Sequence, residues 1–106
     1  MTPLTIKESP TSTGIALEVA GDLDYTSAPQ LRQAAHTTVL SSGRRLTMDL
    51  GGLEFCDSSG ITALIAVRNH AVSAGAEVLL VAVPAHLRRL LDLTGLDQVF
   101  DMRESP

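Results

Sequence analysis

Aromatic residues are scarce in this chain of 106 residues, which has two Phe, one Tyr and no Trp. A hydrophobic core must therefore come from Leu, Val, Ile and Ala, and stacking on nucleic-acid bases or sugar rings is poorly supported. Basic residues are few as well, eight against twelve acidic ones, and apart from the pairs Arg44-Arg45 and Arg88-Arg89 they are scattered. A net charge of -4 without a basic patch argues against nucleic acid as a direct partner.

Cysteine and long apolar runs are also nearly absent. Cys56 is the only cysteine, so no internal disulfide can form and a structural zinc site would lack its usual ligands. The longest apolar run, Val78 to Val83, is far shorter than the roughly 20 residues of a membrane span. The first residues carry one lysine and no apolar stretch typical of a secretion signal. We therefore expect a cytoplasmic protein without membrane insertion, cofactor or metal.

The pattern of apolar residues predicts alternating strands and helices. Period-two alternation predicts strands at 4–9, 15–19 and 46–50, the first two joined by a turn at 10–14. The apolar run 77–83 is typical of a central strand, and 99–102 of an edge strand. Helical spacing predicts helices from 28 to about 40, from 59 to about 74, and a short one after Pro84 that stops at Gly95.

This order of elements favours an α/β fold. Helical crossovers favour parallel neighbours and the initial hairpin adds an antiparallel edge, so we expect a mixed, largely parallel sheet with flanking helices, in one domain over 1–106. Locally, Ser27 and Gln30 match a capping box at the first helix, after a polar loop at 21–26. The pair Gly51-Gly52 is expected to break the third strand.

Asp57-Ser58-Ser59-Gly60 is the segment that carries the strongest chemical signal. It places two hydroxyls beside a carboxylate at the expected start of the second helix, where free backbone N–H groups favour an anion. A phosphate on Ser58 would be tolerated there, but the like charge of Asp57 opposes it, which favours a binding switch over a folding switch. The alternative is that Ser58 or Asp57 is an ordinary helix cap.

The second helix has an unusual face opposite its apolar side. That face carries small or weakly polar residues where a solvated helix usually shows Lys and Glu: Thr62, Ala63, Ala66, Asn69, His70 and Ser73. Either a partner or another part of the same chain would explain it. Arg68 falls within the apolar arc without an evident reason. Cys56, just before the motif, fits a small buried packing residue.

The chain resembles the STAS domain of bacterial anti-sigma-factor antagonists. The resemblance rests on Gly21-Asp22-Leu23-Asp24, Met48-Asp49-Leu50, Asp57-Ser58-Ser59-Gly60-Ile61 and Thr94-Gly95-Leu96, and it spans nearly the whole chain. It implies that Ser58 is phosphorylated by an anti-sigma factor that is also a GHKL-type serine kinase, and that a PP2C-type phosphatase reverses this. The unphosphorylated protein would bind the anti-sigma factor and free the sigma factor.

The resemblance also implies where the partner binds. Asp24 matches the aspartate of a loop that contributes to kinase contact, although a turn-forming role would explain it equally well. Thr62 and Ala66 stand where many members have other residues, which affects partner choice. The expected partner-binding residues are Asp24, Asp57, Ser58, Ser59, Gly60, Thr62, Ala63, Ala66 and Asn69.

Two competing functions remain. An enzyme with Ser58 as nucleophile is disfavoured, because the Gly-x-Ser-x-Gly elbow is absent and none of His36, His70 and His86 is an obvious base. The stronger alternative is a STAS interaction module of a lipid-transport or larger signalling complex, which binds partners without phosphorylation of Ser58. The fold alone does not separate the two.

Overall fold

The computed structural model describes residues 1–38 and 40–104 and contains a mixed sheet with the strand order β1-β2-β3-β4-β5. β1 is antiparallel to β2, and all other neighbouring pairs are parallel, which confirms the predicted α/β class. The described elements are β1 Thr5–Pro10, β2 Gly14–Leu23, α1 Ala28–Thr37, β3 Arg45–Cys56, α2 Ser58–Ser73, β4 Glu77–Val81, α3 Ala85–Leu93, the 3-10 helix η1 Leu96–Gln98 and β5 Asp101–Arg103.

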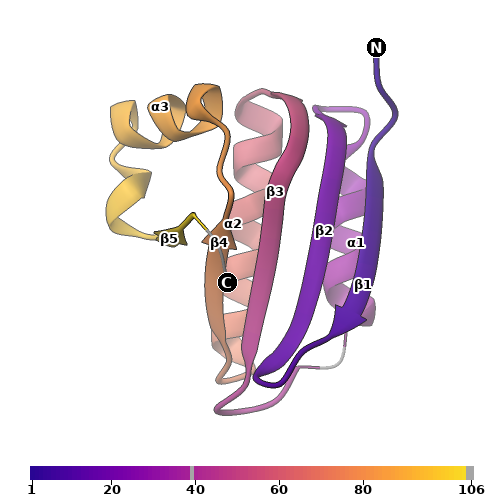
Figure 1. The fold of residues 1–106 in the computed structure, drawn as a ribbon, viewed down its shortest axis with the longest axis vertical. Coiled ribbons are helices and arrows are strands. Elements are labelled where there is room, and N and C mark those ends of the chain that lie inside the picture. The colour runs from indigo at the N-terminus through magenta and orange to yellow at the C-terminus, as the bar shows by residue number, and fades with distance from the viewer. Residues whose placement is uncertain (39, 105–106) are drawn as a thin grey trace.

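The helices α1 and α2 lie on one face of the sheet, and α3 lies near the end of β4 (Figure 1). The core fills the layer between the sheet and these two helices, with Leu17, Met48 and Leu80 fully or almost fully buried. β4 lies inside the sheet between β3 and β5, which confirms the expectation that the apolar run after Glu77 contains a central strand. Leu79, Leu80 and Val81 are all buried, so both faces of β4 are covered there, which explains the continuous apolar run.

Gly51 and Gly52 do not break β3, contrary to the sequence-based expectation. The strand runs through them, and its pairing with β2 shifts twice, between Glu18 and Ala20 and again between Gly21 and Asp22. At each shift β3 has one residue more than β2, which makes a β-bulge. Glycine is well suited to such a bulge. A Cβ on Gly52 would lie 2.7 Å from the Cβ of Ala20, so the two strands approach closely at this point.

The first helix begins at Ala28, as predicted, but its cap and its end differ from the prediction. Ser27 makes no side-chain cap bond, and the Gln30 amide donates to the carbonyl of Leu4 at 3.2 Å, so the predicted capping box is wrong. α1 ends at Thr37, earlier than expected, and the helical position predicted at Val39 lies outside the described residues. None of the helices described in 1–38 and 40–104 combines the length and the apolarity that crossing a membrane requires.

Part of the small-residue face of α2 is covered by α1. Ala63 is fully buried, and the rings of His36 and His70 lie with their centroids 4.6 Å apart. Of the two explanations for this face, cover by the same chain therefore holds for Ala63 and His70. Val72, near the end of α2, is 49% exposed.

Arg68 lies half-buried at the edge of the α2 core face. It lines a hollow of about 220 Å³ with Val99, Phe100 and Asp101 from the C-terminal segment, and it donates to the amide oxygen of Asn69 at 3.5 Å. A long side chain can cover apolar neighbours with its stem while its charged end stays in water. This position explains why an arginine occurs within the apolar arc.

Candidate functional site

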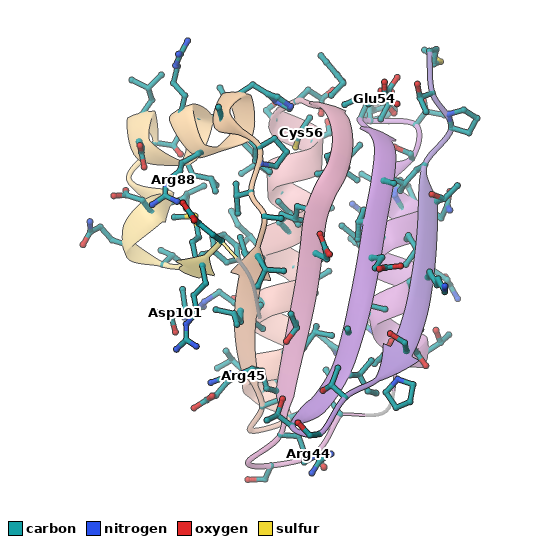
Figure 2. The ribbon with its side chains drawn as sticks, in the orientation of Figure 1. Arg44, Arg45, Glu54, Cys56, Arg88 and Asp101 are labelled. Carbon is teal, nitrogen blue, oxygen red and sulfur yellow. The ribbon has the colours of Figure 1, made fainter. Side chains whose placement is uncertain are left out.

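The site begins where two parallel strands end together. Leu23 of β2 and Cys56 of β3 are register partners, and the Asp57 N–H donates to the carbonyl of Leu23 at 3.3 Å. Asp24 directly follows β2 and Asp57 directly follows β3, so both lie at the same end of the sheet. Figure 2 places Cys56 at this edge and Arg44 at the opposite end of the molecule. The carboxyl edge of parallel strands is the usual place for functional loops.

Asp57 is the N-cap of α2. Its side-chain Oδ1 accepts a hydrogen bond from the Gly60 N–H at 3.0 Å, and its carbonyl accepts from the Ile61 N–H at 3.0 Å. The helix therefore begins at Ser58, one residue earlier than predicted, and Ser58 is its first residue. Of the two cap candidates from the sequence, Asp57 holds the cap.

The two serines of the motif differ in their surroundings. Ser58 is exposed, and its hydroxyl makes no hydrogen bond within residues 1–38 and 40–104. Ser59 is half-buried and lines a hollow of about 500 Å³. Thr62, one turn further along α2, donates its hydroxyl to the Ser58 carbonyl at 2.9 Å and lines the same hollow. Neither serine hydroxyl makes a hydrogen bond within the described residues, so the two differ in exposure, and Ser58 is the exposed one.

Gly60 and Ala63 are buried and present no side-chain surface, so their expected part in partner binding stays a prediction. Ala63 has no exposed surface, because it lies on the buried side of α2. Gly60 is buried against the strand ends, where an added Cβ would lie 2.7 Å from both the Cys56 Sγ and the Leu23 carbonyl oxygen. Both residues position the motif through packing.

Asp24 organises the loop before α1. Its Oδ1 accepts hydrogen bonds from the N–H groups of Thr26 at 3.0 Å and Ser27 at 3.1 Å, and its carbonyl accepts from the Ala28 N–H at 2.7 Å. The Ser27 hydroxyl donates to the carbonyl of Asp22 at 2.8 Å, which ties the loop to the end of β2. The turn-forming role of Asp24 is therefore visible in the structure.

The remaining predicted residues lie further along α2. Ala66 is half-buried and Asn69 is exposed, so they extend away from the cluster formed by Asp24, Asp57 and Ser58. Sequence reasoning missed Tyr25 and Arg32, which line the 500 Å³ hollow with Thr26, Ala28, Pro29, Ser59 and Thr62. Helical spacing places Ala28 and Arg32 on one side of α1, but nothing in the sequence says that this side meets the motif.

Cys56 is a packing residue beside the site. Burial, with a smaller contribution from the nearby Asp57 carboxylate, raises the pKa of its thiol to about 12. The thiol therefore stays protonated near neutral pH and is a poor nucleophile. Across residues 1–38 and 40–104, no three His, Cys, Asp or Glu side chains gather as a metal-ligand group.

Comparisons with known proteins agree with this architecture. A family model described as "Mlab, STAS domain" matches residues 6–104. The anti-sigma-B factor antagonist of Listeria monocytogenes is 27% identical over 94% of this chain and 87% of its own length. The anti-sigma-B factor antagonist of Bacillus subtilis is 28% identical over 83% of this chain and 80% of its own length.

The fold also resembles that of an anti-sigma factor antagonist of known crystal structure. The structure of an anti-sigma factor antagonist from Mycobacterium paratuberculosis has a TM-score of 0.84 and 29% identity, and covers 97% of this chain and 87% of its own. All three names describe regulatory proteins rather than catalysts. The chain belongs to the STAS domain family and resembles its anti-sigma factor antagonists in sequence and in fold.

Proposed function

We propose that this protein is an anti-sigma factor antagonist whose binding to an anti-sigma factor is switched off by phosphorylation of Ser58. In its unphosphorylated form it binds an anti-sigma factor in the cytoplasm, which frees a sigma factor. The anti-sigma factor is also a GHKL-type serine kinase that transfers the γ-phosphate of ATP to the Ser58 hydroxyl. A PP2C-type phosphatase removes the phosphate and resets the switch.

The observation that supports this most is the exposure of Ser58. A phosphate acceptor must reach a partner's active site, and Ser58 is exposed at the first position of α2 while Asp57 caps the helix in its place. Ser59 is half-buried in the hollow and less accessible. Accessibility therefore favours the first serine over the second.

The local charges support a switch in binding rather than in folding. The helix N-terminus attracts an anion by only about 0.3–1 kcal/mol at an exposed site, and the phosphate brings about -1.5 to -2 charges. The Asp57 carboxylate next to Ser58 opposes that charge. Because the Ser58 hydroxyl makes no hydrogen bond with any described residue, the fold should survive phosphorylation and the change should be felt by whatever docks over Ser58.

Intact-mass spectrometry tests the proposal. Wild type, Ser58→Ala and Ser59→Ala are each incubated with ATP and the purified GHKL-type anti-sigma kinases of the same genome. We expect one phosphate on wild type and on Ser59→Ala, and none on Ser58→Ala. Binding of the anti-sigma factor should persist in Ser58→Ala and weaken in Ser58→Asp, although one carboxylate imitates a phosphate imperfectly.

Other outcomes point to other functions. Phosphate retained in Ser58→Ala but lost in Ser59→Ala would move the acceptor to Ser59. No phosphate with any kinase, together with recovery of transporter subunits in a pull-down, would favour the STAS interaction module of a lipid-transport or larger signalling complex. Hydrolysis of an ester substrate that depends on Ser58 would favour an enzyme instead.

A further inference from the structure

An arginine side chain without a partner among the described residues lines the hollow beside the motif. Arg32 of α1 lines it, is half-buried, and makes no hydrogen bond or ion pair with any side chain of residues 1–38 and 40–104. In that part of the chain the single ion pair joins Arg45 to Glu77 at 3.3 Å, on neighbouring strands. A partly desolvated guanidinium gains most from a carboxylate that it can hold with two hydrogen bonds.

The carboxylates near the hollow are already used. Asp57 Oδ1 accepts from the Gly60 N–H and Asp24 Oδ1 accepts from the loop N–H groups, so each side chain is held in its own turn. Among the described residues, neither acid forms an ion pair with Arg32. The edge of the sheet thus shows two fixed negative charges next to one unpaired positive charge.

The rest of the lining fits a side chain rather than an ion alone. Ala28 and Pro29 give the hollow an apolar wall, and Tyr25 is 81% exposed. A volume of about 500 Å³ is within the range of sites that enclose a whole side chain or small ligand. An exposed tyrosine next to an arginine is a common composition for the anchoring centre of an interface.

We propose that the hollow receives an acidic side chain of the anti-sigma factor, with Arg32 as its ion-pair partner and Tyr25 and Pro29 against its stem. This assignment rests on the proposed function. The mixed charges fix the register of docking, because the partner must place a carboxylate at Arg32 and keep its own acids away from Asp24 and Asp57. A phosphate on Ser58 would add negative charge beside the same hollow and repel that carboxylate.

Affinity measurements with the purified anti-sigma factor test the assignment by isothermal titration calorimetry. Arg32→Glu should weaken binding by about tenfold or more, and Arg32→Met, which keeps an apolar stem, by several-fold. Arg44→Glu makes the same charge change at the opposite end of the molecule (Figure 2) and should stay within about twofold of wild type. Replacing the partner's matching Asp or Glu with Lys should restore binding to Arg32→Glu.

The outcomes separate this inference from the function on which it rests. If wild type binds no anti-sigma factor, the proposed function fails. If wild type binds and Ser58→Asp weakens binding, but Arg32→Glu and Arg32→Met bind as wild type does, the function stands and Arg32 only covers the helix surface. Circular dichroism checks that each variant is folded, and Arg32→Met decides the matter if Arg32→Glu does not fold.

Discussion

The carboxylate of Asp57 accepts a hydrogen bond from the backbone N–H of Gly60 at 3.0 Å, across the two serines between them. This bond fixes the first turn of α2 without using either serine hydroxyl. The structural role and the proposed chemical role therefore fall on different residues of one short segment. Mutations can separate them.

Removing the cap should destabilise the protein. Asp57→Ala leaves the Gly60 N–H without its acceptor and should lower the free energy of unfolding by about 0.5–2 kcal/mol. Asp57→Asn keeps an oxygen acceptor and should cost less. Urea unfolding followed by circular dichroism measures both, and equal costs for the two variants would show that the charge matters more than the hydrogen bond.

Removing the proposed acceptor should leave stability unchanged. Ser58→Ala deletes a hydroxyl that makes no hydrogen bond within the described residues, so the free energy of unfolding should change by less than about 0.5 kcal/mol. The same urea titration applies. A loss as large as that of Asp57→Ala would mean that Ser58 contributes to the cap, and binding data on its variants would then need correction for unfolding.

Gly60 should not tolerate a side chain. The Cβ of Gly60→Ala would lie 2.7 Å from the Cys56 Sγ and from the Leu23 carbonyl oxygen, so α2 or the strand ends must shift. We expect a loss of about 1–3 kcal/mol in the free energy of unfolding. Ser59→Ala, one residue earlier on the same turn, is the control. A stable Gly60→Ala would mean that the start of α2 moves easily.

The buried thiol should make the protein less stable in alkali. An ordinary thiol has a pKa of 9.0, and burial raises that of Cys56 to about 12. Between these values the unfolded chain has lost the proton that the folded chain keeps, so the free energy of unfolding falls with rising pH, by up to about 1.4 kcal/mol per unit. Below about pH 9 the full stability is present.

Cys56→Ala is the control for this alkaline effect. Its stability should fall less steeply than that of wild type between about pH 9 and about pH 11, whatever its absolute value, in urea unfolding at several pH values. Thiol labelling of native wild type should be slow as well. Equal slopes for the two proteins, or fast labelling, would show that the thiol is accessible.

The loop before α1 should depend on Asp24 for its shape. Asp24→Ala removes the acceptor for the N–H groups of Thr26 and Ser27 and should lower the free energy of unfolding by about 0.5–1.5 kcal/mol. Asp24→Asn keeps the acceptor and should be nearly as stable as wild type. If Asp24→Asn is stable but binds the anti-sigma factor weakly, the charge of Asp24 acts in binding as well as in the turn.

Much of the fold was predictable because its signals are local. The hairpin, the helix crossovers and the apolar run before Pro84 each follow from the spacing of apolar residues and from turn residues. Gly51 and Gly52 were misread because a glycine pair is typical of both a chain break and a bulge, and only the partner strand decides. The Ser27 capping box failed for a similar reason, since the Ser27 hydroxyl oxygen accepts from the Asp24 N–H at 2.9 Å instead of from the helix.

The sequence predicted the segments that form the site but not which helix faces meet there. The motif itself was identified, and its neighbour Asp24 followed from the resemblance. Ala63 was expected on an open face and Arg32 was missed, because the sequence does not tell which side of α1 meets which side of α2. A small residue such as Ala63 is suited both to a buried helix contact and to a docking surface, and burial decides between them.

The shared end point of β2 and β3 has a consequence for handling this protein in the laboratory. Because Leu23 pairs with Cys56, the separation of the two acidic turns is set by the spacing of adjacent strands, about 4.8 Å, and an inserted residue there would move one turn relative to the other. The turns at 11–13 and 41–44 lie at the far end of these strands. A fluorophore or an affinity tag inserted there should report on docking without disturbing it.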